Sequence, residues 1–295
     1  MTAGVDFDFA RWIASRRSTV DQQAREGIAY AYTGELKFRR TLAAARPVTI
    51  AIEATTRLWK DSARAELLGS AVKVSSQQFP RVYQAARTAG ANLRVTVPTV
   101  FATSSTGVKI KALGTEDAPY LLVNLALAEQ LTDTELVAAI GHELGHIQNG
   151  HILYATALHY LSNSATFFVR WAVQPAIMTL QAWSRRAEVT CDRAALLAVR
   201  DLDQTLAALV KLAMGTTPQA GFSIEEYLRD LPDPRRGLGR YAELFRANAD
   251  VPKRVMALRA FADSAYYAMA TGGDPSGKPS APDVDRRVGE IISVF

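Results

Sequence analysis

Two histidines and a glutamate are the residues of this chain best suited to chemistry: His142, Glu143 and His146, in the sequence Gly-His-Glu-Leu-Gly-His. In an α-helix, side chains at positions i and i+4 share one face, so the two histidines can bind one Zn²⁺. Glu143 then lies beside the ion without being a ligand, where its carboxylate can take a proton from zinc-bound water. These residue types at this spacing predict a metallohydrolase, most simply a peptidase.

The segment that carries these residues has the signals of a helix. Thr132 and Glu135 fit a capping box, and Asp133 falls in the first turn, where the helix dipole favours negative charge. Apolar residues recur at helical spacing, and Asn149-Gly150 supplies a C-terminal stop. The alternative is a core helix with two hydrogen-bonded histidines. It is disfavoured because all four histidines of the chain fall between residues 142 and 159.

A catalytic zinc usually has three protein ligands and one open position. The metzincin pattern places its third histidine six residues after the second, whereas His151 follows His146 by five, so His151 and His159 are interpreted as structural or surface groups. Glu188 and Asp192 are again i and i+4 on a predicted helix. Alone they would suggest a solvated face. Beside the first motif, Glu188 can complete a His₂Glu site of the gluzincin type, and Asp192 can hydrogen-bond a ligand histidine.

The two motifs together resemble metallopeptidase family forty-eight, the group of HtpX-like proteases, CAAX prenyl proteases and mitochondrial Oma-type enzymes. That family pairs HELGH with a later R-x-x-E-x-x-A-D, which residues 185–192 match except that Cys191 replaces the usual Ala. The resemblance covers about residues 70–262. It implies an α+β, predominantly helical zincin fold of the gluzincin type, with a small β-sheet beside the zinc-binding helix. It also implies one Zn²⁺ per chain, with the ligands His142, His146 and Glu188.

The resemblance is incomplete near the C-terminal end. The family's His-Pro-…-Arg stretch appears here as Asp250-Val251-Pro252-Lys253-Arg254, without the histidine. Arg254, Tyr266 and Tyr267 are candidates for transition-state or substrate contacts, although structural roles are favoured. Cys191 could approach the zinc as an inhibitory thiolate, but a small buried side chain is the favoured interpretation.

A short sheet is predicted ahead of the zinc-binding helix, with strands over residues 93–97, 108–113 and 120–124 and a turn at 104–107. In zincins a strand in the last position borders the cleft, and an extended substrate adds to it as a further strand. The predicted substrate-binding edge strand therefore consists of Tyr120, Leu121, Leu122, Val123 and Asn124.

Most of the remaining chain has helical patterning. Helices are predicted through much of residues 8–70 and over 76–89, 203–214, 223–230, 238–247 and 252–269. Gly272 to Asp283 is predicted to be a linker, and Arg286–Phe295 a short apolar-ended tail. The predicted organisation is an N-terminal helical extension (1–70), a catalytic domain (71–270) with a hydrophobic helical hairpin inserted at about 152–183, and a linker and tail (271–295).

Composition agrees with a folded intracellular enzyme. The 295 residues are 48% hydrophobic, enough to bury a full core, and a single cysteine excludes an intramolecular disulfide framework. The N-terminus lacks the apolar run of a secretory signal, so a cytoplasmic location is predicted. The net charge of +5 comes from scattered basic residues, and nucleic-acid binding is therefore not expected.

The segment between the two motifs bears on membrane contact. A spanning helix needs about 20 largely apolar residues. Residues 152–169 contain several polar side chains, and Arg170 and Pro175 interrupt the second half of the segment. We expect a hairpin that packs on the protein, on a partner subunit or on a membrane surface. Its aromatic residues leave peripheral membrane contact open, and a homo-oligomer is also left open.

The function predicted from these residues is that of a zinc-dependent metalloendopeptidase. Its substrate is a polypeptide, and Glu143 activates a zinc-bound water. Two alternatives remain. One is a latent peptidase, in which residues 1–70 or the tail occupies the cleft. The other is a non-catalytic, chaperone-like zinc-binding protein, which the intact Glu143 disfavours, since a structural site needs no general base.

Overall fold

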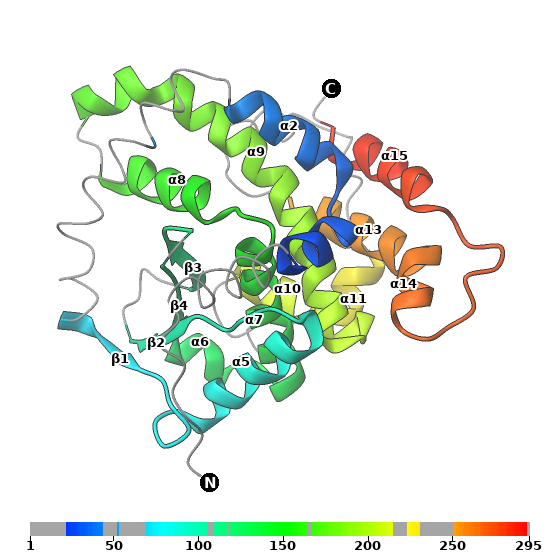
Figure 1. Cartoon of the computed structure of the whole chain (residues 1–295), viewed down its shortest axis with the longest axis horizontal. Coiled ribbons are helices and arrows are strands. Elements are labelled where there is room, and N and C mark those ends of the chain that lie inside the picture. Colours follow the sequence, from blue (N-terminus) through cyan, green and yellow to red (C-terminus); the bar gives the residue numbers. More distant parts are fainter. Residues whose placement is uncertain are drawn as a thin grey trace, which may run out of the picture.

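The computed structural model describes residues 22–43, 52, 69–104, 109–116, 118–164, 167–214, 223–230 and 250–293. Within them, helices make up most of the fold and one small sheet lies at its left side in Figure 1, so the predicted α+β, predominantly helical fold class is confirmed. Residues 22–30 are helical. The named helices are α2 (Thr33–Ala43), α5 (Pro80–Leu93), α6 (Leu125–Glu129), α7 (Asp133–Gln148), α8 (Ile152–Ser164), α9 (Phe167–Val199), α10 (Leu202–Met214), α11 (Ile224–Arg229), α13 (Val251–Ala262), α14 (Ala265–Ala270) and α15 (Ala281–Ile292).

The sheet has four strands in the order β1-β2-β4-β3, formed by β1 (Ala71–Lys73), β2 (Thr99–Thr103), β3 (Ile110–Gly114) and β4 (Pro119–Asn124). Strand β2 runs parallel to β4, and the other pairs are antiparallel. Residues 120–124 do form a strand, but the prediction that this strand lies at the edge of the sheet is wrong, because β4 lies between β2 and β3. The physical reason is its unbroken apolar run, buried on both faces, which is typical of an interior strand. The edge strand that contacts α7 is β3.

Helix α7 begins as the sequence predicts. The Thr132 hydroxyl accepts a hydrogen bond from the Glu135 N–H, and the Glu135 carboxylate accepts one from the Thr132 N–H, which confirms the capping box. This reciprocal pair satisfies two backbone donors that the first turn would otherwise leave free. The helix therefore starts at a defined residue and carries His142 and His146 about three and about four turns further on.

Two glycines let α7 approach α9 closely. A Cβ added to Gly141 would lie 2.6 Å from the Cβ of Ala198, and one added to Gly145 would lie 2.6 Å from the Cβ of Ala194. Both distances are well below any real contact between carbon atoms, so a larger residue at either position would force the helices apart. Because each glycine directly precedes a histidine, this close packing brings both histidines next to α9.

The predictions for residues 76–89 and 93–97 differ from the structure. Helix α5 begins at Pro80, whose fixed φ suits the first helical position, and it continues beyond the predicted end at residue 89. The helix ends at Leu93, because the next residue, Arg94, adopts the left-handed conformation with φ 53°. The Val95 N–H then donates a hydrogen bond to the Gly90 carbonyl. The predicted strand at 93–97 is therefore wrong, and β2 forms at 99–103 instead.

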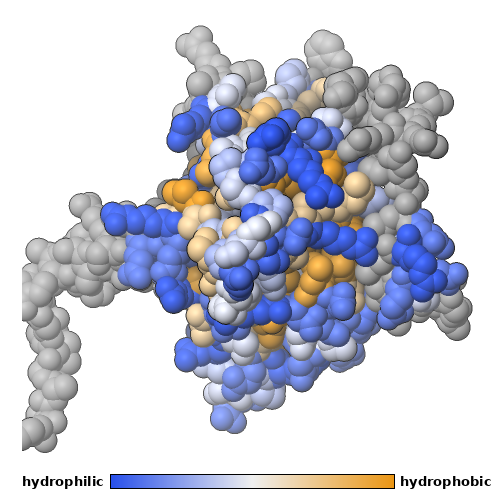
Figure 2. All heavy atoms as spheres, turned by 90° about the vertical axis from the view of Figure 1, so that its right-hand side faces the viewer, coloured by the Kyte–Doolittle hydropathy of each residue, from blue (hydrophilic) through white to orange (hydrophobic). Residues whose placement is uncertain are grey.

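The C-terminal segments also differ from prediction. The predicted helix 252–269 is two helices, because Ser264 caps a new one by accepting the Tyr267 N–H. Residues 281–292 of the predicted linker and tail form α15, whose Val284, Val288 and Ile291 are buried and which packs on α13. Figure 2 looks onto this side of the molecule and shows hydrophilic residues with hydrophobic ones exposed between them. The described part of the tail lies far from β3 (Figure 1).

The N-terminal helix α2 packs against α9, in a small core that includes Leu42, Leu180 and Trp183. Helices α8 and α9 contact each other, as a helical hairpin would. Among the described residues, no helix is both long and apolar enough to cross a membrane. The predicted helix at 238–247, most of the predicted turn at 104–107 and most of residues 1–70 lie outside the described residues.

Candidate metal centre

The structure brings His142 and His146 of α7 against Glu188 of α9. The Nε2 atom of His142 lies 3.5 Å from one carboxylate oxygen of Glu188, and the Nε2 atom of His146 lies 3.7 Å from the other. Ligand atoms bound tetrahedrally to one zinc at about 2.0–2.1 Å are about 3.3 Å apart. The three side chains are buried, and each of the two histidine–carboxylate distances is within a few tenths of an ångström of that separation.

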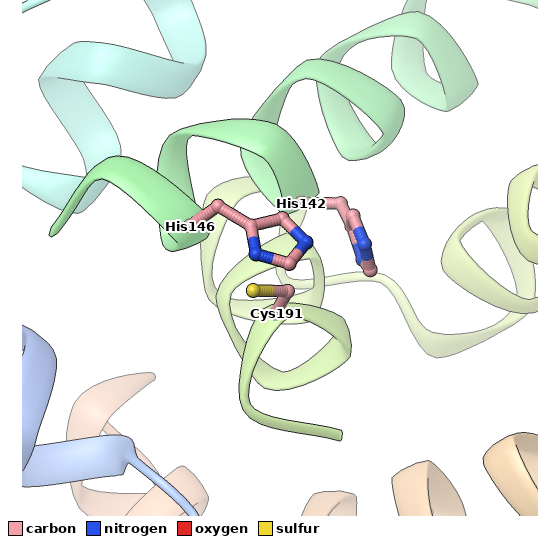
Figure 3. Close-up of side chains that lie close together, drawn as sticks. All are labelled: His142, His146 and Cys191. Atoms are coloured by element: carbon pink, nitrogen blue, oxygen red, sulfur yellow. The ribbon is translucent and has the colours of Figure 1, made fainter. Parts of the chain in front are cut away.

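Cys191 forms a second grouping with the same two histidines. One donor atom from each of His142, His146 and Cys191 lies within 4.8 Å of the others. Figure 3 shows the sulfur beside His146, on the side of the ring away from the nitrogen that points toward His142. In agreement, the sulfur is 3.7 Å from Nδ1 of His151, which itself contacts Nδ1 of His146 at 3.2 Å. The Cys191 sulfur therefore lies near Nδ1 of His146, whereas Nε2 of His146 faces Glu188.

The chemistry of the thiol also favours Glu188 as the third ligand. Burial raises the pKa of Cys191 well above its ordinary value, and the negative charges of Glu188, Glu143, Asp192 and Glu35 raise it further. A zinc ligand must be the thiolate, and this environment opposes its formation. A carboxylate needs no such activation. The donor set with Glu188 therefore fits a zinc ion better than the set with Cys191.

Asp192 and Arg254 surround the outer side of this site. The Asp192 carboxylate lies 3.1 Å from Nδ1 of His142, one helical turn after Glu188. Arg254 of α13 donates to both oxygens of Asp192, at 2.8 and 2.6 Å, and its Nη1 lies 3.0 Å from Glu188. Helix α13 therefore fixes both carboxylates through one guanidinium group, which is bidentate toward Asp192.

The charges of this cluster suit a cation. Burial raises the pKa of Glu188, but the Arg254 charge and the two histidines outweigh burial and leave it well below its ordinary value. Burial lowers the pKa of His142, yet hydrogen bonds to Asp192 and Glu188 raise it to about 10. Two ionised carboxylates that hold a proton on His142 so firmly would equally attract a divalent cation.

Glu143 lies between α7 and the edge of the sheet. Its side chain is half-buried, and Oε2 accepts a hydrogen bond from the Ala112 N–H of β3 at 2.6 Å. This bond orients the carboxylate and uses only one of its two oxygens. Among the described contacts, the second oxygen has no hydrogen bond.

Not every predicted contact residue reaches the site. Arg254 does, but Tyr266 and Tyr267 lie on α14, where their rings pack against Phe261 at centroid distances of 5.9 and 6.0 Å. Among the described contacts, neither tyrosine touches a side chain of the metal centre. A packing role, which the sequence already favours for both tyrosines, accounts for these contacts.

The other two histidines, His151 and His159, are predicted from the sequence to have structural or surface roles. His159 lies on α8, where burial and the charge of Lys111 lower its pKa to about 4. His151 is fully buried and contacts His146, and burial lowers its pKa to about 4 despite the nearby Glu35. The position of His151 in the sequence shows that it does not fit the metzincin pattern. It does not show that His151 contacts His146, one of the candidate metal ligands. Glu35 gives no signal at all, because it lies far from both motifs in the sequence.

Comparison with known proteins gives two matches. The sequence model of peptidase family M48 matches residues 112–262, a stretch that contains the end of β3, α7, Glu188, Asp192 and Arg254. The plastoglobule-localized metallopeptidase 48, chloroplastic, of Arabidopsis thaliana is 32% identical over 154 residues, which are 51% of this chain and 45% of that protein. The chain therefore aligns with less than half the length of this relative. No solved structure matches significantly.

Proposed function

Because the chain belongs to peptidase family M48, a metallopeptidase family, we propose that it is a zinc-dependent endopeptidase. The ligands in this proposal are His142, His146 and Glu188. The observation that carries it is the convergence of both histidine Nε2 atoms on the Glu188 carboxylate, at 3.5 and 3.7 Å. Three buried donors at this spacing, with ionised carboxylates around them, are typical of a gluzincin site.

Each residue of the site has a separate task. When bound, Zn²⁺ acidifies a water molecule and polarises a peptide carbonyl group. Glu143 keeps one oxygen on the Ala112 N–H, so its other oxygen can accept the proton from water and later deliver it to the leaving amine. Asp192 accepts the Nδ1–H of His142 and thereby leaves the Nε2 lone pair free for the metal. Arg254 holds Asp192 and Glu188 in place.

The substrate would bind as a strand along β3. The N–H groups of Ala112 and Gly114 contact Glu143 and Thr156, so residues 110, 112 and 114 direct their backbone polar groups away from β4. An extended peptide can pair with such an edge. At Gly114, however, the Thr156 hydroxyl already bonds both the N–H and the C=O, each at 3.1 Å. Because Glu143 holds the Ala112 N–H, pairing is limited to the backbone groups of Ile110 and the C=O of Ala112.

The first test is zinc content, measured by mass spectrometry on the purified full chain, with casein hydrolysis assayed alongside. We expect one zinc per chain and hydrolysis that a chelator abolishes and added zinc restores. A chain that takes up no zinc would overturn the proposal. Zinc without hydrolysis would favour the latent or non-catalytic alternative.

The role of β3 can be tested with wild-type protein and modified peptides. Methylating one backbone nitrogen at a time in a cleaved peptide removes one hydrogen-bond donor, worth about 0.5–1.5 kcal/mol. We expect kcat/KM to fall roughly 2- to 10-fold at alternate positions near the cleaved bond, because strand pairing has a period of two. We also expect no effect at positions that would lie beyond Gly114. A profile without this alternation would contradict binding along β3.

Peripheral membrane contact through residues 152–183 and a homo-oligomer stay predictions. The name of the Arabidopsis thaliana relative places that protein at plastoglobules. We propose, on that likeness, that this chain also works at a lipid surface.

A further inference from the structure

A buried chain of polar groups connects the metal centre to the N-terminal helix α2. Nδ1 of His146 lies 3.2 Å from Nδ1 of His151, and Nε2 of His151 lies 3.4 Å from Oε1 of Glu35. The same oxygen accepts a hydrogen bond from Nε1 of Trp183 at 3.0 Å. His151 and Glu35 are both 0% exposed. A polar chain buried this deeply is costly unless each member has a partner.

We propose that Glu35 is a positioning residue of the metal centre and that it acts through His151 to hold the ring of His146. This inference rests on the proposed zinc site. It adds to that site a residue of α2, a helix that lies outside the family-matched residues 112–262.

The placement of protons on the two imidazoles follows from the geometry. A His146 that binds zinc through Nε2 carries its proton on Nδ1 and must donate it. The acceptor at 3.2 Å is Nδ1 of His151, whose own proton then has to be on Nε2. That N–H faces the Glu35 carboxylate, which can only accept. The 3.4 Å contact lacks hydrogen-bond geometry, so the negative charge of Glu35 is what favours a proton on Nε2 of His151. The Cys191 sulfur, 3.7 Å from Nδ1 of His151, is a second neighbour of that acceptor.

The opposite tautomer of His151 would have two unfavourable contacts. Its Nδ1–H would face the Nδ1–H of His146, and its Nε2 lone pair would face the negative Glu35. Glu35 therefore selects the tautomer that accepts from His146. Without this carboxylate, His151 is free to adopt either tautomer, and His146 loses a fixed acceptor.

The two ligand histidines are thus held in parallel ways. His142 donates to Asp192 of α9 directly, and His146 reaches Glu35 of α2 through one extra imidazole. Helix α2 is fixed against α9 by apolar contacts that include Leu42 and Trp183, so Glu35 has a rigid support. Outer partners of this kind set ring orientation and ligand basicity.

The test is the zinc affinity of the full chain, measured by competition with a chromophoric chelator. We expect Glu35→Gln to bind zinc about 10- to 100-fold more weakly than wild type. Glu135→Gln is the matched control, because Glu135 is a buried carboxylate of α7 that bonds Lys211 and the Thr132 N–H instead. We expect it to lower thermal stability and leave zinc affinity within twofold.

A double-mutant cycle separates positioning from a general structural role. His151→Asn supplies an amide oxygen that can accept from His146 without help from Glu35. In that background we expect Glu35→Gln to have no further effect on zinc affinity, whereas a merely structural contribution would be additive. If Glu35→Gln does not fold, Glu35→Asp, which draws the carboxylate back by one methylene, is measured in the same cycle.

The outcomes distinguish this inference from the proposed function. Wild type that binds zinc, together with unchanged affinity in Glu35→Gln or additive effects in the cycle, overturns the role of Glu35 alone. Wild type that binds no zinc overturns both. Weakened binding in Glu35→Gln that disappears in the His151→Asn background supports the proposal.

Discussion

Replacing Glu143 with Gln will leave zinc bound and lower kcat/KM for casein or a peptide about 10²- to 10⁴-fold, the usual contribution of a general base. Glutamine has nearly the same shape, and its amide oxygen can still accept the Ala112 N–H that orients the wild-type carboxylate. It lacks the proton affinity that the proposed mechanism requires. Zinc content by mass spectrometry and initial hydrolysis rates measure the two effects separately.

The matched control for Glu143→Gln is Glu129→Gln, which removes an exposed carboxylate from α6, the helix that precedes α7. We expect its zinc content and hydrolysis to equal those of wild type. Turnover retained by Glu143→Gln in a preparation free of other proteases would remove Glu143 from the catalytic role.

Two substitutions distinguish the two donor sets that share His142 and His146. We expect Glu188→Ala to lose zinc and hydrolysis, and Cys191→Ala to keep both. The reason is that the histidine Nε2 atoms face Glu188, whereas burial and nearby carboxylates keep the Cys191 sulfur protonated. Zinc affinity and zinc content measured on both variants decide between them.

Folding must be separated from ligand loss in this comparison. Glu188→Gln keeps the volume of the side chain and a polar group near Arg254, so it should fold with a weakened metal site. Circular dichroism and thermal denaturation verify that each variant is folded. Loss of zinc in Cys191→Ala with zinc retained in Glu188→Ala would make the sulfur a ligand and contradict the gluzincin assignment.

Local features of the structure could be predicted well from the sequence. The capping box of Thr132 and Glu135 forms as expected, because it depends only on side chains and backbone groups three residues apart. The same holds for the pairing of residues at i and i+4, which placed His142 with His146 and Glu188 with Asp192 on shared helical faces. The fold class followed from the same motifs and their resemblance to a known family.

Errors occurred where two signals overlap or where strand order matters. The segment 93–97 looks like a strand, but the cap at Arg94 ends a helix there. The run at 120–124 was correctly predicted as a strand, yet its place inside the sheet depends on pairing with both β2 and β3. Strand order is a non-local property, so periodicity within one strand cannot reveal it.

The types of the proposed metal ligands, their spacing along two helices and the start of α7 follow from the sequence alone, because each depends on neighbours within a few helical turns. Three contacts are known only from the folded chain: Arg254 joins both carboxylates, β3 borders Glu143, and His151 lies between His146 and Glu35. These contacts join residues far apart in the chain, and they exist because glycines at 141 and 145 let α7 pack closely on α9 while α2 packs on α9 in turn. No local pattern encodes such contacts, since packing of whole helices sets them.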